Sequence, residues 1–160
     1  MLATARTVRS AKYQALLKRT VLPELEIKVQ SIACIGLAER IDVGEVDSPE
    51  TIALINTYLE PVKNSDVDVV VLGCTHYVFI RREVSHLIGD DVPVVDGNAG
   101  TARQVKAVLQ REGLLRSGDL MPFDNPTELQ NRVTIFASAN ADKTIPLCKQ
   151  YLARELGLGA

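Results

Sequence analysis

The chain lacks tryptophan, is poor in other aromatic residues and carries almost no excess charge. Among its 160 residues there is no Trp, aromatic residues make up 4%, and the formal net charge is −2. A protein that binds nucleic acid or an anionic membrane through charge needs a strongly basic surface, so the composition excludes both partner classes. The one adjacent basic pair, Arg81 and Arg82, is expected on a solvated helix face.

Cysteine and long apolar runs are also scarce. The three cysteines are widely spaced and form no C-x-x-C motif, which excludes a disulfide framework and a structural zinc site. No apolar run approaches the roughly 20 residues that cross a membrane, and the first residues do not have the pattern of a signal peptide. The sequence therefore predicts a reduced, cytoplasmic protein.

Motifs of the common cofactor-binding and hydrolase classes are missing as well. The chain has no Gly-rich phosphate loop, no H-E-x-x-H and no G-x-S-x-G. The string GNAG at 97–100 is too short a glycine pattern to imply a dinucleotide. We therefore expect neither a cofactor nor a metal ion.

What the sequence does contain is an alternation of strand-like and helix-like segments. Short connections between such segments predict an α/β fold with a mostly parallel sheet flanked by helices. The region 114–131 has the weakest periodicity and is expected to be a surface connection. Strands are predicted ending near residue 3 and at 25–29, 67–73, 92–97 and 132–140, and helices following Ser10, following Ser48, from 78 to Gly89, from 98 to Gly113 and from 143 to Gly157.

Polar loops follow several of the predicted strands. Ligands of open parallel sheets bind beyond the carboxyl ends of the strands, so these loops are expected to gather on one rim. The side chains offered there are Cys74, Thr75, His76, Thr4, Thr7, Ser10, Asp96, Asn98 and Thr101.

The string GCTHY at 73–77 places a thiol and an imidazole two residues apart at the end of a buried strand. A thiol becomes an effective acid, base or nucleophile where its surroundings favour the thiolate, as beside a histidine or at a helix start. Cys74 is either such a thiol or a small buried hydrophobic residue. Cys34 and Cys148 are expected to be structural.

For other polar residues, the sequence allows two interpretations. Asp96 either orients a group on the rim or caps the helix that follows it. Thr4 and Thr7 either bind a carboxylate through their hydroxyls and a helix start, or only form turns. His86 lies within a predicted helix and is expected at the surface.

Four segments, taken in order, resemble the glutamate racemases, which are cofactor-independent enzymes that supply D-glutamate for peptidoglycan. VVVLGCTHYVFI at 69–80 resembles the second-cysteine motif of that family. LATARTVRSAKY at 2–13 is similar to its Thr-x-x-Thr-Val-x-Ser-x-x-Tyr segment, and VVDGNAGTARQV at 94–105 to its Asp-containing strand-to-helix turn. VTIFASANADKTIPLCKQYL at 133–152 is similar to the closing strand and helix.

The resemblance implies one lobe of a pseudo-symmetric, two-lobed α/β racemase. In that family two cysteines, one from each lobe, flank the α-carbon of the substrate. One cysteine removes the proton and the other returns it from the opposite face. Carried onto this chain, Cys74 is one acid/base thiol, His76 assists it, Thr75 and His76 contact the substrate, and Thr4 and Thr7 lie near it.

The chain also departs from the family pattern. The Asp-Ser-Gly loop and the Cys-Asn-Thr-Ala motif of the N-terminal lobe do not occur in it. We therefore expect a C-terminal portion, with 1–125 forming the lobe of the second cysteine and 126–160 a closing strand and helix that pack on the other lobe. Val78, Arg6 and Gly97 replace the more common Pro, Gly and Ser.

The predicted function is that of a glutamate racemase, an isomerase of peptidoglycan and cell wall biogenesis and hence of cell shape. Glutamate is the expected small-molecule substrate. The chain alone is expected to be inactive, because it carries one of the two required thiols. A non-catalytic interaction or regulatory remnant, or another racemase of the Asp/Glu superfamily, are the alternatives. If the chain is one lobe, the apolar face that meets the other lobe is exposed. Such a face predicts self-association into a homo-oligomer.

Overall fold

The computed structural model describes residues 1–21, 24, 26–63, 65–116 and 126–158. They form two compact units, Met1–Ala102 and Arg103–Ala160.

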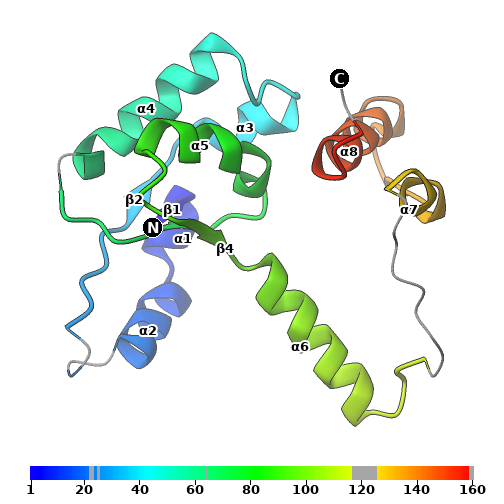
Figure 1. Ribbon diagram of the computed structural model, residues 1–160, viewed down its shortest axis with the longest axis horizontal. Coiled ribbons are helices and arrows are strands. Elements are labelled where there is room, and N and C mark those ends of the chain that lie inside the picture. Colours follow the sequence, from blue (N-terminus) through cyan, green and yellow to red (C-terminus); the bar gives the residue numbers. More distant parts are fainter. Residues whose placement is uncertain (22–23, 25, 64, 117–125, 159–160) are drawn as a thin grey trace. The chain divides into compact units, whose positions relative to one another are not determined.

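The first unit is built on a parallel sheet of four strands in the order β2-β1-β3-β4 (Figure 1). Every neighbouring pair is parallel, with Leu2 of β1 opposite Leu72 of β3 and Leu72 opposite Asp96 of β4. The predicted α/β fold with a mostly parallel sheet is confirmed. The strands are β1 Leu2–Ala3, β2 Ile32–Ala33, β3 Val70–Leu72 and β4 Val94–Asp96.

Two helices begin at serines that the sequence predicted as caps, and α5 ends before a predicted glycine. Ser10 Oγ accepts a hydrogen bond from the Tyr13 N–H at 3.1 Å, and Ser48 Oγ accepts one from the Thr51 N–H at 3.2 Å. Gly89, with a φ of +100°, follows the last residue of α5, as predicted. The helices are α1 Ala5–Arg9, α2 Ala11–Thr20, α3 Leu37–Asp42, α4 Pro49–Lys63, the 3₁₀ helix η2 Tyr77–Ile80, α5 Arg81–Ile88 and α6 Asn98–Arg111, which crosses the boundary between the units.

Apolar side chains from the helices and the sheet form the core of the first unit. In Figure 1, α4 and α5 lie on one side of the sheet, and α1 and α2 lie on the other. Ile55 and Leu59 of α4 and Val84 of α5 are completely buried, and Leu2 and Leu72 contribute from the sheet. Burial of each such side chain favours folding by about 1.5–3 kcal/mol. This packing holds the short strands in place.

The strand predicted at 25–29 is wrong for residues 26–29, and residue 25 lies outside the described residues. Residues 27–31 have no regular structure, and the strand forms instead at Ile32–Ala33. Ile27 and Val29 are 51% and 40% exposed, so their alternation buries no apolar face. The strand lies further along because the Ile32 N–H and the Cys34 N–H donate to carbonyl groups of the β1 segment, at Met1 and Ala3.

The second unit contains α7 Pro126–Arg132 and α8 Ala141–Glu155. The strand predicted at 132–140 is wrong, because residues 133–137 have no regular structure and Phe136 is 88% exposed. A strand requires a neighbour for its hydrogen bonds, and the described part of this unit contains helices only. Helix α7 was not predicted, since 114–131 was expected as a connection, while the final helix ends before Gly157 as predicted. The lobe boundary after residue 125 stays a prediction.

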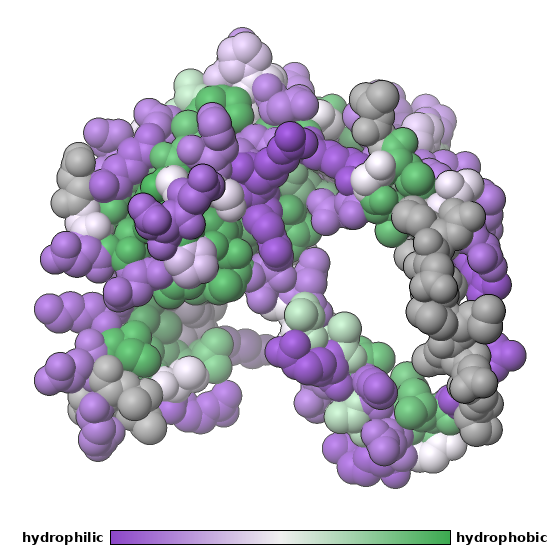
Figure 2. Space-filling view, viewed as in Figure 1, coloured by the Kyte–Doolittle hydropathy of each residue, from purple (hydrophilic) through white to green (hydrophobic). Residues whose placement is uncertain are grey.

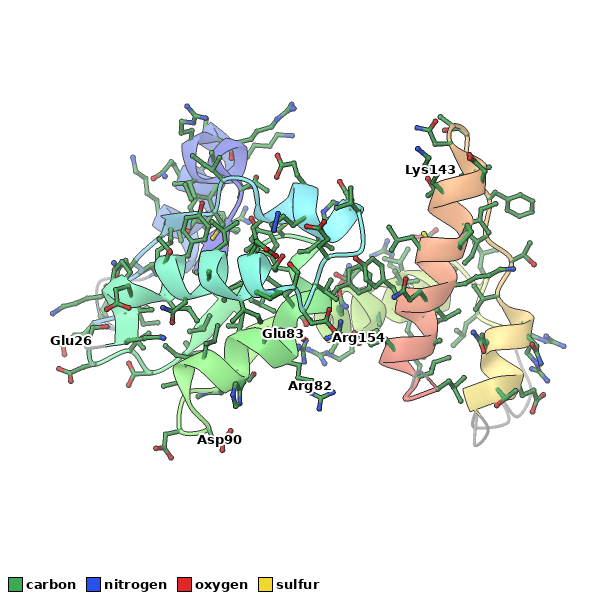
Figure 3. All side chains as sticks on the ribbon, turned by 90° about the horizontal axis from the view of Figure 1, so that it is seen from above. Glu26, Arg82, Glu83, Asp90, Lys143 and Arg154 are labelled. Carbon is green, nitrogen blue, oxygen red and sulfur yellow. The ribbon has the colours of Figure 1, made fainter. Side chains whose placement is uncertain are left out.

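The surface agrees with the balanced composition. On the face that Figure 2 shows, hydrophobic areas lie between hydrophilic side chains. Arg82 points away from α5 in Figure 3, as a solvated residue does, whereas Arg81 forms an ion pair with Asp96. None of the described helices is both long and apolar enough to cross a membrane.

Candidate active site

The chain leaves β3 at Gly73 and enters η2 through a tight turn that carries Cys74, Thr75 and His76. The Gly73 N–H donates to the Leu2 carbonyl at 2.8 Å, which holds the turn against β1. A Cβ at position 73 would lie 3.1 Å from that carbonyl oxygen and 2.9 Å from Met1 Cε, so this close approach favours glycine. The turn therefore begins at a fixed point on the carboxyl edge of the sheet.

Cys74, His76 and Asp42 form a continuous polar chain on this edge. Cys74 Sγ lies 3.6 Å from His76 Nδ1, and His76 Nε2 lies 2.9 Å from Asp42 Oδ1. A carboxylate only accepts hydrogen bonds, so Nε2 carries the proton in this pair and the lone pair of Nδ1 faces the thiol. The arrangement lets His76 take the thiol proton while Asp42 stabilises the resulting imidazolium.

Asp42 is a candidate site residue that the sequence did not predict. It is the last residue of α3, where the helix dipole disfavours a negative charge. The side chains of His76 and Asp42 are 39% and 63% exposed, and even a charged pair with such exposure contributes only about 0–1 kcal/mol to stability. Asp42 is therefore better explained as the residue that orients the His76 imidazole than as a contributor to stability. The only sequence signal for Asp42 was its acidic side chain in the segment after Cys34.

The predicted threonines lie on the same edge of the sheet. Thr4 follows β1, the neighbour of β3, and its Oγ1 accepts a hydrogen bond from the Thr7 N–H at 3.2 Å. The hydroxyls of Thr4 and Thr7 are 3.0 Å apart. The two side chains thus form the helix-start turn that was one of their two readings, and Thr75 is exposed beside Cys74. Binding of a carboxylate by these hydroxyls stays a prediction.

The remaining cysteines and histidine occupy the places expected of structural residues. Cys34 is 3% exposed, and burial raises the pKa of its thiol to about 11. Cys148 is partly exposed on α8, in the second unit, and His86 is exposed on α5. Neither Cys34 nor Cys148 belongs to the chain of contacts around Cys74.

Asp96 has the structural role that was one of its two readings. Its Oδ1 accepts a hydrogen bond from the Asn98 N–H at 2.8 Å, at the start of α6. Its ion pair with Arg81 reaches the start of α5. Asp96 therefore ties together two helix starts.

The structure offers no metal centre within the residues it describes. No group of three or more His, Cys, Asp or Glu side chains is placed to hold an ion there.

Known proteins resemble this chain in sequence and in fold. The model of the Asp/Glu/Hydantoin racemase family matches residues 1–105. The chain belongs to this family. The matched residues include β1 to β4 and the whole Cys74 turn.

The similar curated proteins are glutamate racemases. The glutamate racemase of Stutzerimonas stutzeri is 39% identical over 119 residues, which cover 74% of this chain and 44% of that protein. The glutamate racemase of Pseudomonas aeruginosa is 39% identical over 118 residues, with 74% and 43% covered. The chain thus spans less than half the length of these relatives.

Solved structures show the same partial coverage. A glutamate racemase isoform from Bacillus anthracis superposes with a TM-score of 0.62 at 27% identity, over 73% of this chain and 43% of that chain. A glutamate racemase from Francisella tularensis in complex with D-glutamate gives a TM-score of 0.63 over 74% and 43%, and at 23% identity it supports the fold alone. The resemblance to glutamate racemases that the sequence motifs indicated is confirmed for family and fold.

Proposed function

We propose that this chain supplies one of the two acid/base thiols of a glutamate racemase, an isomerase that interconverts L- and D-glutamate. The observation that carries the proposal is the Cys74–His76–Asp42 chain of contacts at the carboxyl edge of the sheet. It lies in a segment similar to glutamate racemases at 39% identity. The product D-glutamate would serve peptidoglycan and cell wall biogenesis, and thereby cell shape, from the cytoplasm.

In the proposed reaction, Cys74 acts on one face of the α-carbon of glutamate. His76 Nδ1 takes the thiol proton, the thiolate removes the α-proton, and the electron pair remains on the substrate as a carbanion stabilised by its carboxylate. In the reverse direction the Cys74 thiol gives its proton to the carbanion from the same face. The hydroxyls of Thr75, Thr4 and Thr7 hold the substrate in this proposal, which uses no cofactor and no metal.

Racemisation requires a second acid/base group on the opposite face of the α-carbon. The Cys-Asn-Thr-Ala motif that carries this group in the family does not occur in the 160 residues. We therefore propose that these residues alone do not racemise glutamate.

The test uses a chimeric protein, called the joined protein below. It joins this chain to the part of the Stutzerimonas stutzeri glutamate racemase that has no counterpart in this chain. The joined protein is expected to racemise glutamate, followed by circular dichroism, while the 160-residue chain is expected not to. Glutamate, aspartate and a hydantoin are compared as substrates. Turnover of aspartate or the hydantoin without glutamate would favour another racemase of the superfamily. A folded joined protein without turnover of any substrate would favour a non-catalytic interaction or regulatory role.

A further inference from the structure

Tyr77 lies where the Cys74 turn becomes η2, and it holds two separate parts of the site. Its side chain is completely buried. Its backbone N–H donates to the Cys74 carbonyl at 3.1 Å, and its hydroxyl donates to the Cys34 carbonyl at 3.1 Å. Because β1 separates β2 from β3 in the sheet, Tyr77 connects the ends of two strands that are not neighbours.

The loop after β2 is fixed by two tyrosine hydroxyls on consecutive carbonyls. Tyr58 of α4 donates to the Ile35 carbonyl at 2.6 Å, next to the Cys34 carbonyl that accepts from Tyr77. The following residue, Gly36, has a φ of +80° and precedes the first residue of α3. The two hydroxyls therefore hold the loop from which α3 begins.

We propose that Tyr77 is a positioning residue for Cys74 that acts through α3 and the Asp42–His76 pair. Its backbone N–H bonds to the turn that carries His76, and its hydroxyl bonds to the loop that leads to Asp42. Tyr77 is therefore linked to both partners of the 2.9 Å contact between His76 Nε2 and Asp42 Oδ1, to His76 through the backbone of the turn and to Asp42 through its hydroxyl. The proposal deepens the proposed function, because it concerns the same thiol.

Tyr77 is not suited to exchange protons with a substrate itself. Its hydroxyl is directed at a backbone carbonyl within the core. Burial, and then the neighbouring Cys34 and Cys74 thiols, raise the pKa of Tyr77 well above its ordinary value. A phenol that stays protonated donates a constant hydrogen bond, which suits a geometric role.

The first experiment measures how fast iodoacetamide alkylates Cys74 in the folded 160-residue chain, by peptide mass spectrometry from pH 6 to 9. Tyr77→Phe keeps the ring and removes the hydroxyl, and it is expected to slow the reaction about fivefold to tenfold. This is below the roughly 10²-fold that a 1 Å misplacement of a reacting group can cost. Tyr13→Phe is the matched control, because Tyr13 is also buried and its hydroxyl lies 2.6 Å from Ser31 Oγ, outside this loop. It is expected to lower the urea midpoint similarly and to leave the alkylation rate unchanged.

A double-mutant cycle tests the route through Asp42. Asp42→Ala is expected to slow alkylation of Cys74 by about tenfold, and adding Tyr77→Phe is expected to slow it no further, because effects that share one route are not additive. Unchanged alkylation in Tyr77→Phe, equal slowing in Tyr13→Phe, or effects that multiply in the double variant would each overturn the proposal.

A second variant keeps the proposal testable if Tyr77→Phe does not fold. Tyr58→Phe removes the neighbouring hydroxyl from a less buried side chain, and it is expected to slow Cys74 in the same direction by a smaller factor. A rate equal to that of the parent chain would contradict the positioning role. Alkylation needs no turnover of glutamate, so racemisation by the joined protein reports separately on the proposed function.

Discussion

Replacing Cys74 with serine in the joined protein is expected to slow glutamate racemisation by about 10²–10⁴-fold, the range of positioned acid/base groups. A serine hydroxyl is a far weaker acid than a thiol, so His76 Nδ1 would no longer receive the proton across the 3.6 Å contact. The proton could then neither leave nor return on this face of the α-carbon. Circular dichroism of glutamate solutions measures the rate.

Cys148→Ser is the control for this change. Cys148 is a partly exposed cysteine on α8 with no role in the proposed reaction, so its replacement is expected to leave the rate within a factor of two. A Cys74→Ser protein that kept a tenth of the parent rate would show that another group transfers the proton.

Thr51→Val is expected to lower the free energy of unfolding by about 2–3 kcal/mol, because it removes three part-buried hydrogen bonds that share one hydroxyl. Thr51 is completely buried, and its Oγ1 accepts hydrogen bonds from Arg40 Nε at 2.9 Å and Ser48 Oγ at 3.0 Å. The same hydroxyl donates to the Glu45 carbonyl. Valine has the same shape and can make none of these bonds, so α3 loses one of its connections to the start of α4 and keeps the Arg40–Glu50 ion pair. Urea unfolding followed by circular dichroism measures the loss.

Thr51→Ser is the matched control, since it keeps the hydroxyl and removes one methyl group. Its expected cost is about 1 kcal/mol. Equal destabilisation by the two variants would mean that packing of the methyl group, rather than the hydrogen bonds, stabilises this junction.

Local signals in the sequence predicted much of the first unit. Ser48 begins α4 and Gly89 ends α5 because each acts on backbone groups within a few residues. The Cys74–His76 pair is equally local, since only Thr75 lies between its members. Such features depend little on the rest of the fold.

Features that depend on distant partners could not be predicted in the same way. Asp42 reaches His76 only because α3 is placed by the loop after β2, a relation that no periodicity records. The alternation at 25–29 predicted a strand, but apolar alternation does not say whether another element covers it, and Ile27 and Val29 are exposed. The strand predicted at 132–140 is wrong for a related reason. A strand needs a neighbouring strand for its hydrogen bonds, and the apolar pattern does not show whether one is present.

The most direct test of the account is the order in which the three cysteines of the folded 160-residue chain react with iodoacetamide at pH 7–8. Cys74 is expected to react first, because His76 Nδ1 can accept its proton, and Cys148 more slowly. Cys34 is expected to react only on unfolding, because it is buried and its pKa is raised to about 11. His76→Ala is expected to slow Cys74 about tenfold, the lower part of the change that loss of a positioned base produces, and to leave Cys148 unchanged. Faster reaction of Cys34 or Cys148 than of Cys74, or a Cys74 rate that ignores His76→Ala, would contradict the claim that this turn forms an acid/base site.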